Sequence, residues 1–303
     1  MTTTTMLQID EDAPIATWFK VGGRADRLAR PTDIDQLRQC LELDPAHRIL
    51  GDGANLLVDD DGVGELVVSL ERMNRVDWDA GEDLVEVGAG VNLPKFITEA
   101  VRRGRAGVEG LGGIPATMGG ALVMNAGGAF GQIADVVERV TALDRHGRTV
   151  VLARSQIDFG YRHSGLNHLL IVGAALRLPR GDAEALRAKL KEVMAYKRDS
   201  QPMADNSAGC CFKNPTLEHD VAGAGAAGQR VSAGKLIDLA KCKGLRIGSA
   251  RVSDRHGNFL TADTGGRARD VILLMEEVER CVRERFGVTL HREVAVWRRT
   301  PAT

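Results

Sequence analysis

The chain has 303 residues, of which 44% are hydrophobic and 27% charged, and its 40 Lys and Arg residues nearly balance 41 Asp and Glu residues. A net charge of −1 gives no electrostatic reason to expect a nucleic-acid partner. No window approaches the ~18 uninterrupted apolar residues typical of a membrane-spanning helix, so membrane insertion is not expected. The length predicts two packed domains or three smaller lobes.

The first residues and the cysteines both favour a cytoplasmic enzyme. The N-terminal segment, MTTTTMLQIDEDAPIATW, has neither a basic leader nor an apolar core, which predicts a protein that is not secreted. The five cysteines form no Cys-x-x-Cys pair, so we expect reduced thiols and neither a disulfide framework nor a metal site.

Strand and helix signals alternate through the first half of the chain. Thr32 and Asp35 have the spacing of a capping box ahead of an apolar periodicity, which predicts a helix of about ten residues. RILGDG reads as a strand that enters a glycine turn. LVEVGAG repeats that pattern, and the following PKFITEAVRRG predicts a helix that Gly104 ends. GDGANLL and GAGVNLP are too short to distinguish an internal duplication from two similar turns.

Ten glycines lie between Gly104 and Gly131, a density typical of backbone that a ligand approaches closely. A flexible linker is the alternative, but linkers are usually filled with polar residues. Here apolar side chains such as Leu111, Ile114 and Met118 are interleaved with the glycines. We therefore expect this segment to contact a ligand.

Two long helices are expected in the second half. Apolar residues at helical spacing over 183–197, Met194 among them, and over 268–286 predict core-facing stripes, and Gly287 follows the second one. Trp18 is likewise expected to be a core or packing residue. ARVSDRHGNFLTAD alternates around an Arg-His-Gly turn and predicts a hairpin. The fold class is therefore expected to be mixed α+β.

Neither glycine turn completes the Gly-x-Gly-x-x-Gly pattern, because leucine stands at the sixth position in both, and no Walker-type string is present. Glycine turns still bind phosphates, since successive backbone N–H groups form an anion-binding concavity. The motifs therefore favour a dinucleotide in a frame that is not of the Rossmann type.

Five strings occur together in order: GDGANLLV, GLGGIPATMGGALVMNAGG, DFGYRHS, SAGCCFKNP and HREVAVW. From Thr17 to Trp297 the chain resembles the UDP-N-acetylenolpyruvoylglucosamine reductase (MurB) family. The resemblance implies an FAD-binding module of the vanillyl-alcohol-oxidase (PCMH) type over 13–182, with lobes at about 13–72 and 73–182. A substrate-binding α+β domain is expected over 183–300. A diverged flavin-binding protein and an FAD oxidase of the same fold are the alternatives.

The resemblance places two glycine-rich segments around the pyrophosphate and adenosine parts of FAD. The asparagines in them have turn propensity as an alternative reason for their presence. The expected FAD contacts are Gly51, Gly53, Ala54, Asn55, Leu56, Gly113, Ile114, Pro115, Thr117, Gly119, Gly120, Asn125, Ala126 and Gly127.

The family's activity is NADPH-dependent reduction of UDP-N-acetylglucosamine enolpyruvate, and the choice of NADPH over NADH follows from the resemblance alone. Arg162 and Glu293 match the residues that flank the substrate carboxylate in the family, so the two domains are expected to meet. Without the resemblance, both would be read as ordinary surface charges. Cys210 stands where similar proteins usually have a proton-donating serine, and a thiol is a stronger acid than an alcohol.

Other interpretations of the cysteine pair stay open. Cys210 as a small buried hydrophobe, Cys211 as a substitute donor, and a disulfide between the two on oxidation are the alternatives. The resemblance also implies substrate contacts from Tyr161, Gln201, Lys213 and Asn214. His256 and Asn258 lie at or after the expected hairpin turn and are given no catalytic role.

Overall fold

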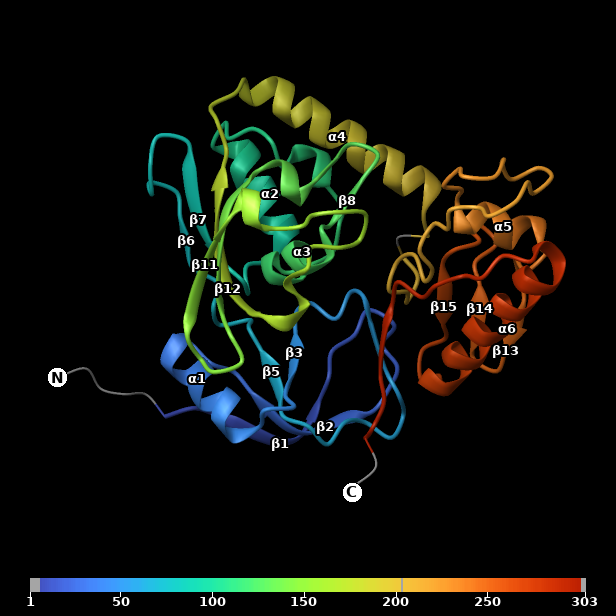
Figure 1. The fold of residues 1–303 in the computed structure, drawn as a ribbon, viewed down its shortest axis with the longest axis horizontal. Helices are drawn as coiled ribbons and strands as arrows, with labels where there is room; N and C mark the ends of the chain where they lie inside the picture. Colours follow the sequence, from blue (N-terminus) through green and yellow to red (C-terminus); the bar gives the residue numbers. More distant parts are fainter. Residues whose placement is uncertain (1–5, 203, 301–303) are drawn as a thin grey trace. The chain divides into compact units, whose positions relative to one another are not determined.

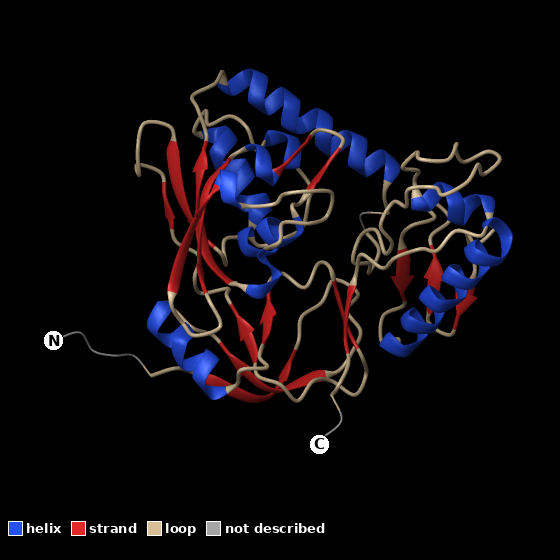
Figure 2. Cartoon of the chain, in the orientation of Figure 1, coloured by secondary structure: helices blue, strands red, loops and turns tan. Residues whose placement is uncertain are grey.

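The computed structural model describes residues 6–202 and 204–300 and contains both helices and sheets, which confirms the mixed α+β class (Figures 1 and 2). Contacts divide the chain into two compact units. Unit 1 comprises the described residues of 1–13, 25–52 and 65–197, and unit 2 comprises those of 14–24, 53–64 and 198–303. Each unit has its own buried apolar core.

A four-stranded sheet lies in unit 1. Its central strand β5 pairs in parallel with β2 and β3, so that Val67 faces Leu28 and Val68 faces Ile49. The strands are, in spatial order, β1 (Ile9–Pro14), β2 (Arg24–Ala29), β5 (Val67–Ser69) and β3 (Arg48–Leu50). The strand expected in RILGDG is therefore confirmed as β3.

Helix α1 (Ile34–Leu43) confirms the expected helix, but its cap is one residue from the predicted one. Asp33 is the N-cap residue, and its carboxylate accepts the Gln36 backbone N–H at 2.9 Å. The Gln36 side chain reaches back to accept the Thr32 N–H at 2.9 Å. The capping box between Thr32 and Asp35 is therefore wrong, because the helix is capped one residue later and the returning side chain is that of Gln36.

A five-stranded antiparallel sheet forms the larger part of unit 1, and Figure 1 shows α2 and α3 against one of its faces. Glycine residues 88 and 173 face each other where β7 pairs with β12. The strands are, in spatial order, β11 (Thr149–Ala153), β10 (Val137–Leu143), β12 (Leu170–Arg177), β7 (Leu84–Gly88) and β6 (Val76–Asp77).

Helix α2 (Leu93–Arg102) follows the second glycine turn as expected, and Gly104 after it has φ +64°. A glycine tolerates this left-handed backbone without the Cβ clash that other residues suffer. The remaining pieces of unit 1 are α3 (Met118–Met124), the hairpin of β8 (Gly127–Gly128) and β9 (Gly131–Gln132), and four short 3₁₀ turns at Glu109–Leu111, Ile133–Asp135, Arg154–Gln156 and Leu166–His168.

Helix α4 (Ala183–Ser200) begins where a helix was expected, but its apolar stripe is only partly buried. Leu186 and Val193 are buried, whereas Met194 is 42% exposed. Trp18 is 40% exposed. The core position expected for Met194 is therefore wrong, since helical spacing indicates the apolar side of a helix but not what covers it. For Trp18, this exposure excludes a core position and leaves the packing role a prediction.

Unit 2 is built on a three-stranded antiparallel sheet with α6 packed along it (Figures 1 and 2). The predicted hairpin is confirmed by the pairing of β14 (Ala250–Val252) with β15 (Leu260–Ala262), and β13 (Arg246–Ile247) lies outside β14. Helix α6 (Ala268–Phe286) has the expected bounds. Helix α5 (Ala233–Leu239) is short.

The compact units do not follow the two continuous domains expected. Strand β4 (Leu56–Val58) pairs in parallel with β16 (Ala295–Trp297), which draws an N-terminal segment into unit 2. Most of α4 belongs to unit 1, because Val193 and Leu190 pack against Gly112. The expected division at residues 182 and 183 stays a prediction.

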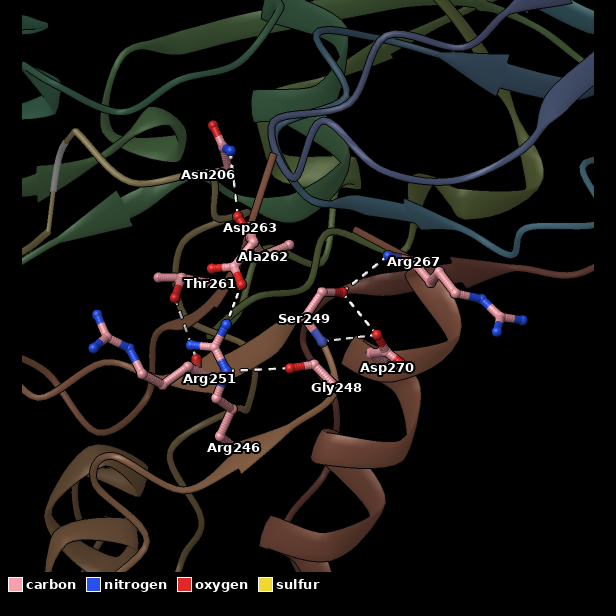
Figure 3. A network of polar contacts seen from close by, with 10 residues as sticks. All are labelled: Asn206, Arg246, Gly248, Ser249, Arg251, Thr261, Ala262, Asp263, Arg267 and Asp270. Atoms are coloured by element: carbon pink, nitrogen blue, oxygen red, sulfur yellow. Dashed lines mark hydrogen bonds and ion pairs between the residues drawn. The ribbon is translucent and has the colours of Figure 1, made fainter. Parts of the chain in front are cut away.

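Polar contacts hold the β13–β14 turn to the start of α6 (Figure 3). The Ser249 hydroxyl donates to Asp270 Oδ2 at 2.7 Å and accepts the Arg267 N–H at 2.9 Å. Arg246 on β13 forms an ion pair with Asp263, which follows β15. Within 6–202 and 204–300, no helix combines the length and the apolar character needed to cross a membrane.

Candidate active site

The segment that carries Cys210 is held between two others in unit 2. Isolated bridges join Cys210 to Phe259 and Phe212 to Arg292. The Cys211 N–H donates to the Asn258 carbonyl at 2.8 Å, and the Cys211 carbonyl accepts the Glu293 N–H at 2.8 Å. Two residues expected to be catalytic, Cys210 and Glu293, are therefore brought to adjacent segments of one unit.

Asn258 holds this segment through its side chain as well. Its Oδ1 accepts the Phe212 N–H at 2.9 Å, while its Nδ2 donates to the Phe212 carbonyl at 2.8 Å. The side chain is almost fully buried, with 2% exposed. Its own backbone N–H donates to His256 Nδ1 at 3.2 Å. No sequence pattern indicates this contact, because the partners are 46 residues apart.

The two adjacent cysteines have different surroundings. Cys210 is half-buried, whereas Cys211 is completely buried in the core of unit 2. Burial raises the pKa of the Cys211 thiol to about 12, and the negative charge of Glu293 also raises it. Neither cysteine forms a disulfide bond. A fully buried thiol with so high a pKa is poorly suited to donate a proton to a substrate, which favours Cys210 over Cys211.

Arg162 lies in unit 1 with an unusual backbone conformation, φ +53°. Its Nη1 donates to the Gly127 carbonyl at 2.8 Å, and its guanidinium carbon lies 5.5 Å from the centre of the Tyr161 ring. Left-handed backbone at a non-glycine residue costs energy, so the surrounding contacts must hold it. The expected catalytic arginine is therefore held at a defined position beside Tyr161.

Lys197 is a second cation near Arg162 that the sequence did not indicate. Burial lowers the pKa of its ammonium to about 8, and the charge of Arg162 lowers it further. A Cβ on Gly113 would lie 3.1 Å from Lys197 Cδ, so the lysine stem packs on the glycine-rich segment. Two neighbouring cations favour an anion between or beside them. The only sequence signal was the place of Lys197 at the end of the 183–197 stripe.

The glycine-rich segments of unit 1 have room for a ligand and little room for side chains. A Cβ on Gly51 would lie 2.8 Å from Thr117 Oγ1, and that oxygen accepts the Gly120 N–H at 3.3 Å as the N-cap of α3. A Cβ on Gly119 would lie 3.1 Å from the Ala89 methyl. Gly51 and Gly120 are exposed. Exposed glycine backbone beside a capped helix start fits the phosphate groups of FAD.

Other expected FAD contacts in unit 1 are more enclosed. Asn125 has φ +44° and its side chain donates to Gln132 Oε1 and the Gly160 carbonyl, each at 2.9 Å. Its turn role is therefore clear, and its contact with FAD stays a prediction. The enclosed residues are the half-buried Gly113, Ile114, Pro115 and Gly127 and the buried Ala126.

In unit 2, the expected FAD contacts lie beside Glu293. The Asn55 side chain donates to the Glu293 carbonyl at 3.0 Å. A Cβ on Gly53, which has φ +64°, would lie 2.1 Å from the Ala16 carbonyl oxygen, so only glycine fits there. Ala54 and Leu56 are buried. These contacts give the segment a structural role and leave its contact with FAD a prediction.

Three residues expected to bind the substrate lie in unit 2, before and after the cysteine segment in the sequence. The Lys213 N–H donates to the His291 carbonyl at 2.8 Å, which continues the pairing beside Glu293. The Asn214 side chain accepts the Ala233 N–H at 3.0 Å at the start of α5. Gln201 is half-buried and lies just after α4. Their substrate contacts stay predictions.

Comparison with known proteins agrees with these features. The model of the UDP-N-acetylenolpyruvoylglucosamine reductase C-terminal domain matches residues 201–297, and an FAD-binding-domain model matches residues 25–153. A UDP-N-acetylenolpyruvoylglucosamine reductase of Moorella thermoacetica is 36% identical, over 96% of this chain and 94% of its own. The chain belongs to the UDP-N-acetylenolpyruvoylglucosamine reductase family. It has an FAD-binding domain, as the resemblance implied.

Further relatives of this reductase family support the assignment. The reductase of Syntrophobacter fumaroxidans is 37% identical, over 92% of this chain and 80% of its own. The crystal structure of the Thermus caldophilus enzyme superposes with a TM-score of 0.80 at 36% identity, covering 96% of this chain and 99% of that one. The match spans both compact units, so the family fold extends over the whole described chain.

Proposed function

We propose that this chain is an FAD-dependent reductase that uses NADPH to convert UDP-N-acetylglucosamine enolpyruvate to UDP-N-acetylmuramate, a step of peptidoglycan precursor synthesis in the cytoplasm. Family membership across the chain supports the reaction. The observation that carries the proposal is the pairing of the Cys210 segment with Glu293, which puts a thiol and a carboxylate on neighbouring segments. The small-molecule partners follow from family membership, and the net charge of −1 gives no reason to expect nucleic acid.

The reaction adds one hydride and one proton across the carbon–carbon double bond of the enolpyruvyl group, while NADPH is oxidised to NADP⁺. Gly51, Thr117 and the Gly113–Gly127 segment would hold FAD, which would supply the hydride-transfer chemistry. Addition at the methylene carbon moves the π electrons toward the carboxylate. A fixed guanidinium such as that of Arg162 stabilises the negative charge that develops there.

The remaining steps belong to unit 2. Cys210 Sγ donates a proton to the carbon next to the carboxylate, and the thiolate that results takes a proton back from solvent. Glu293 helps to orient the carboxylate end of the substrate. Tyr161, Gln201, Lys213 and Asn214 contribute the other polar contacts with the nucleotide substrate.

Anaerobic turnover of the flavin-loaded protein tests the proposal. NADPH oxidation that requires the enolpyruvyl nucleotide, with one UDP-N-acetylmuramate formed per NADPH, is the expected result. Flavin that NADPH reduces but the nucleotide never reoxidises would contradict the proposal and favour a diverged flavin-binding protein. Reoxidation by oxygen with an alcohol or sugar as electron donor would indicate an oxidase.

A further inference from the structure

We propose that Asn258 is a positioning residue that sets the place of the Cys210 thiol relative to Glu293, an inference that rests on the function proposed above. Asn258 does not face the substrate in this role. It acts through the backbone of the segment that carries Cys210.

The Asn258 side chain hydrogen-bonds to Phe212 in the way that the backbone of a neighbouring strand would. The Asn258 amide makes both bonds of the Phe212 peptide, at 2.9 Å and 2.8 Å, as a neighbouring antiparallel strand would. Its own carbonyl accepts the Cys211 N–H at 2.8 Å. Three bonds from one residue therefore fix the three peptides that follow Cys210.

The opposite side of the segment is fixed by the residues around Glu293. Arg292 bridges Phe212, and the Glu293 N–H donates to the Cys211 carbonyl at 2.8 Å. The segment cannot shift along its axis while both sides are paired. Loss of the Asn258 amide would remove two of the three bonds on the other side, leaving the Phe212 N–H and carbonyl in a buried place with no partner from residue 258.

A primary amide is the side chain that this role requires. It supplies one donor and one acceptor in a plane, which matches the donor and acceptor of a peptide. Aspartate at 258 would keep an acceptor for the Phe212 N–H but would set a second carboxylate oxygen against the Phe212 carbonyl. The turn before it is held by the bond from the Asn258 N–H to His256 Nδ1, so the amide has little freedom to swing away.

Asn258→Ala tests the proposal, and Ser249→Ala is the matched control. The control removes the hydroxyl contacts with Asp270 and Arg267 in the same unit, without touching the Cys210 segment (Figure 3). In Asn258→Ala we expect amide hydrogen exchange at Phe212 to rise at least about tenfold, since its acceptor is gone. We expect flavin reoxidation by the enolpyruvyl nucleotide to slow by about 10²-fold, the scale of general acid catalysis, while flavin reduction by NADPH changes little. Ser249→Ala should leave the exchange rate at Phe212 and the rates of flavin reoxidation and reduction unchanged.

A double-mutant cycle separates positioning from general destabilisation. In the Cys210→Ala background, Asn258→Ala should slow reoxidation by less than threefold, since it acts through the thiol already removed. Equal effects of Asn258→Ala with and without Cys210 would overturn the proposal, as would unchanged exchange at Phe212. If the alanine variant does not fold, Asn258→Asp is used instead, with the same exchange and cycle criteria.

Failure of the reductase function would be recognised separately. If wild-type protein does not turn over the nucleotide, the rate of Cys210 alkylation by iodoacetamide replaces the reoxidation rate. Asn258→Ala should then change Cys210 alkylation at least threefold, and Ser249→Ala should not. Equal alkylation rates in Asn258→Ala and wild type would overturn the positioning role.

Discussion

Replacement of Gly51 by alanine should weaken FAD binding, because the added Cβ would lie 2.8 Å from Thr117 Oγ1. Thr117 can yield only by turning this oxygen away from the Gly120 N–H that it caps. Loss of a cap costs ~1 kcal/mol, and overpacking in a tight contact brings the total to ~1–3 kcal/mol. We expect the apoprotein to relieve this strain by moving residue 51 and Thr117 apart, and FAD binding to require them back in place, so that the cost is subtracted from the free energy of binding. Since ~1.4 kcal/mol is tenfold in affinity, FAD should bind roughly 5- to 140-fold more weakly.

Titration of the apoprotein with FAD, followed by quenching of flavin fluorescence, measures this effect. Gly128→Ala is the control, because its Cβ would have no atom within 4 Å and the residue lies just outside the expected contacts. The control should bind FAD as the wild type does. The reasoning would be refuted by wild-type affinity in Gly51→Ala, or by equal losses in the two variants.

Three further predictions concern stability, pH and thiol chemistry. Leu274→Ala, at a position with 0% exposure in α6, should lower the free energy of unfolding by ~2–5 kcal/mol in urea denaturation, and a loss below ~1 kcal/mol would contradict the packing described for unit 2. Burial, together with the charge of Lys243, holds the pKa of His256 below its usual 6.5. The unfolded chain therefore binds the proton more readily than the folded one. The contribution of His256 to the free energy of unfolding is full above about pH 6.5 and falls as the pH drops toward the lowered pKa. His256→Asn should flatten this dependence in thermal melts between pH 5 and 8, roughly the range where histidine titrates. Iodoacetamide should alkylate Cys210 and leave Cys211 unmodified in folded protein. Activity should be equal with and without dithiothreitol, because a thiol with a pKa of about 12, such as Cys211, is a poor partner for disulfide formation. Modification of Cys211 would restore the disulfide hypothesis.

Local patterns predicted local structure well in this chain. The stripe over 268–286 and the glycine after it gave the bounds of α6, because a helix needs an apolar face and a residue that tolerates left-handed backbone at its end. The hairpin of β14 and β15 followed from alternation around a short turn. The cap of α1 was missed by one residue, since Asp33 and Thr32 are both good capping residues and only the backbone selects one.

Contacts between distant segments could not be predicted in this way. The pairing of β4 with β16 joins residues 56–58 to residues 295–297, and no periodicity carries that information. Cys210 and Glu293 were identified through their motifs, but the hydrogen bonds that bring them together became visible only in the structure. Asn258 was read as a turn residue because its partner, Phe212, lies far away in sequence. Lys197 showed its charge in the sequence but not its nearness to Arg162.

Single-turnover reoxidation of the NADPH-reduced protein by UDP-N-acetylglucosamine enolpyruvate tests the central claim most directly, in wild type, Cys210→Ala, Cys210→Ser and Cys211→Ala. The account predicts a loss of about 10²-fold or more in Cys210→Ala, with smaller losses in Cys210→Ser and Cys211→Ala. Serine keeps a proton that can be donated, and Cys211 is a buried core residue. Full activity in Cys210→Ala, or a greater loss in Cys211→Ala, would contradict the assignment of Cys210 as the proton donor.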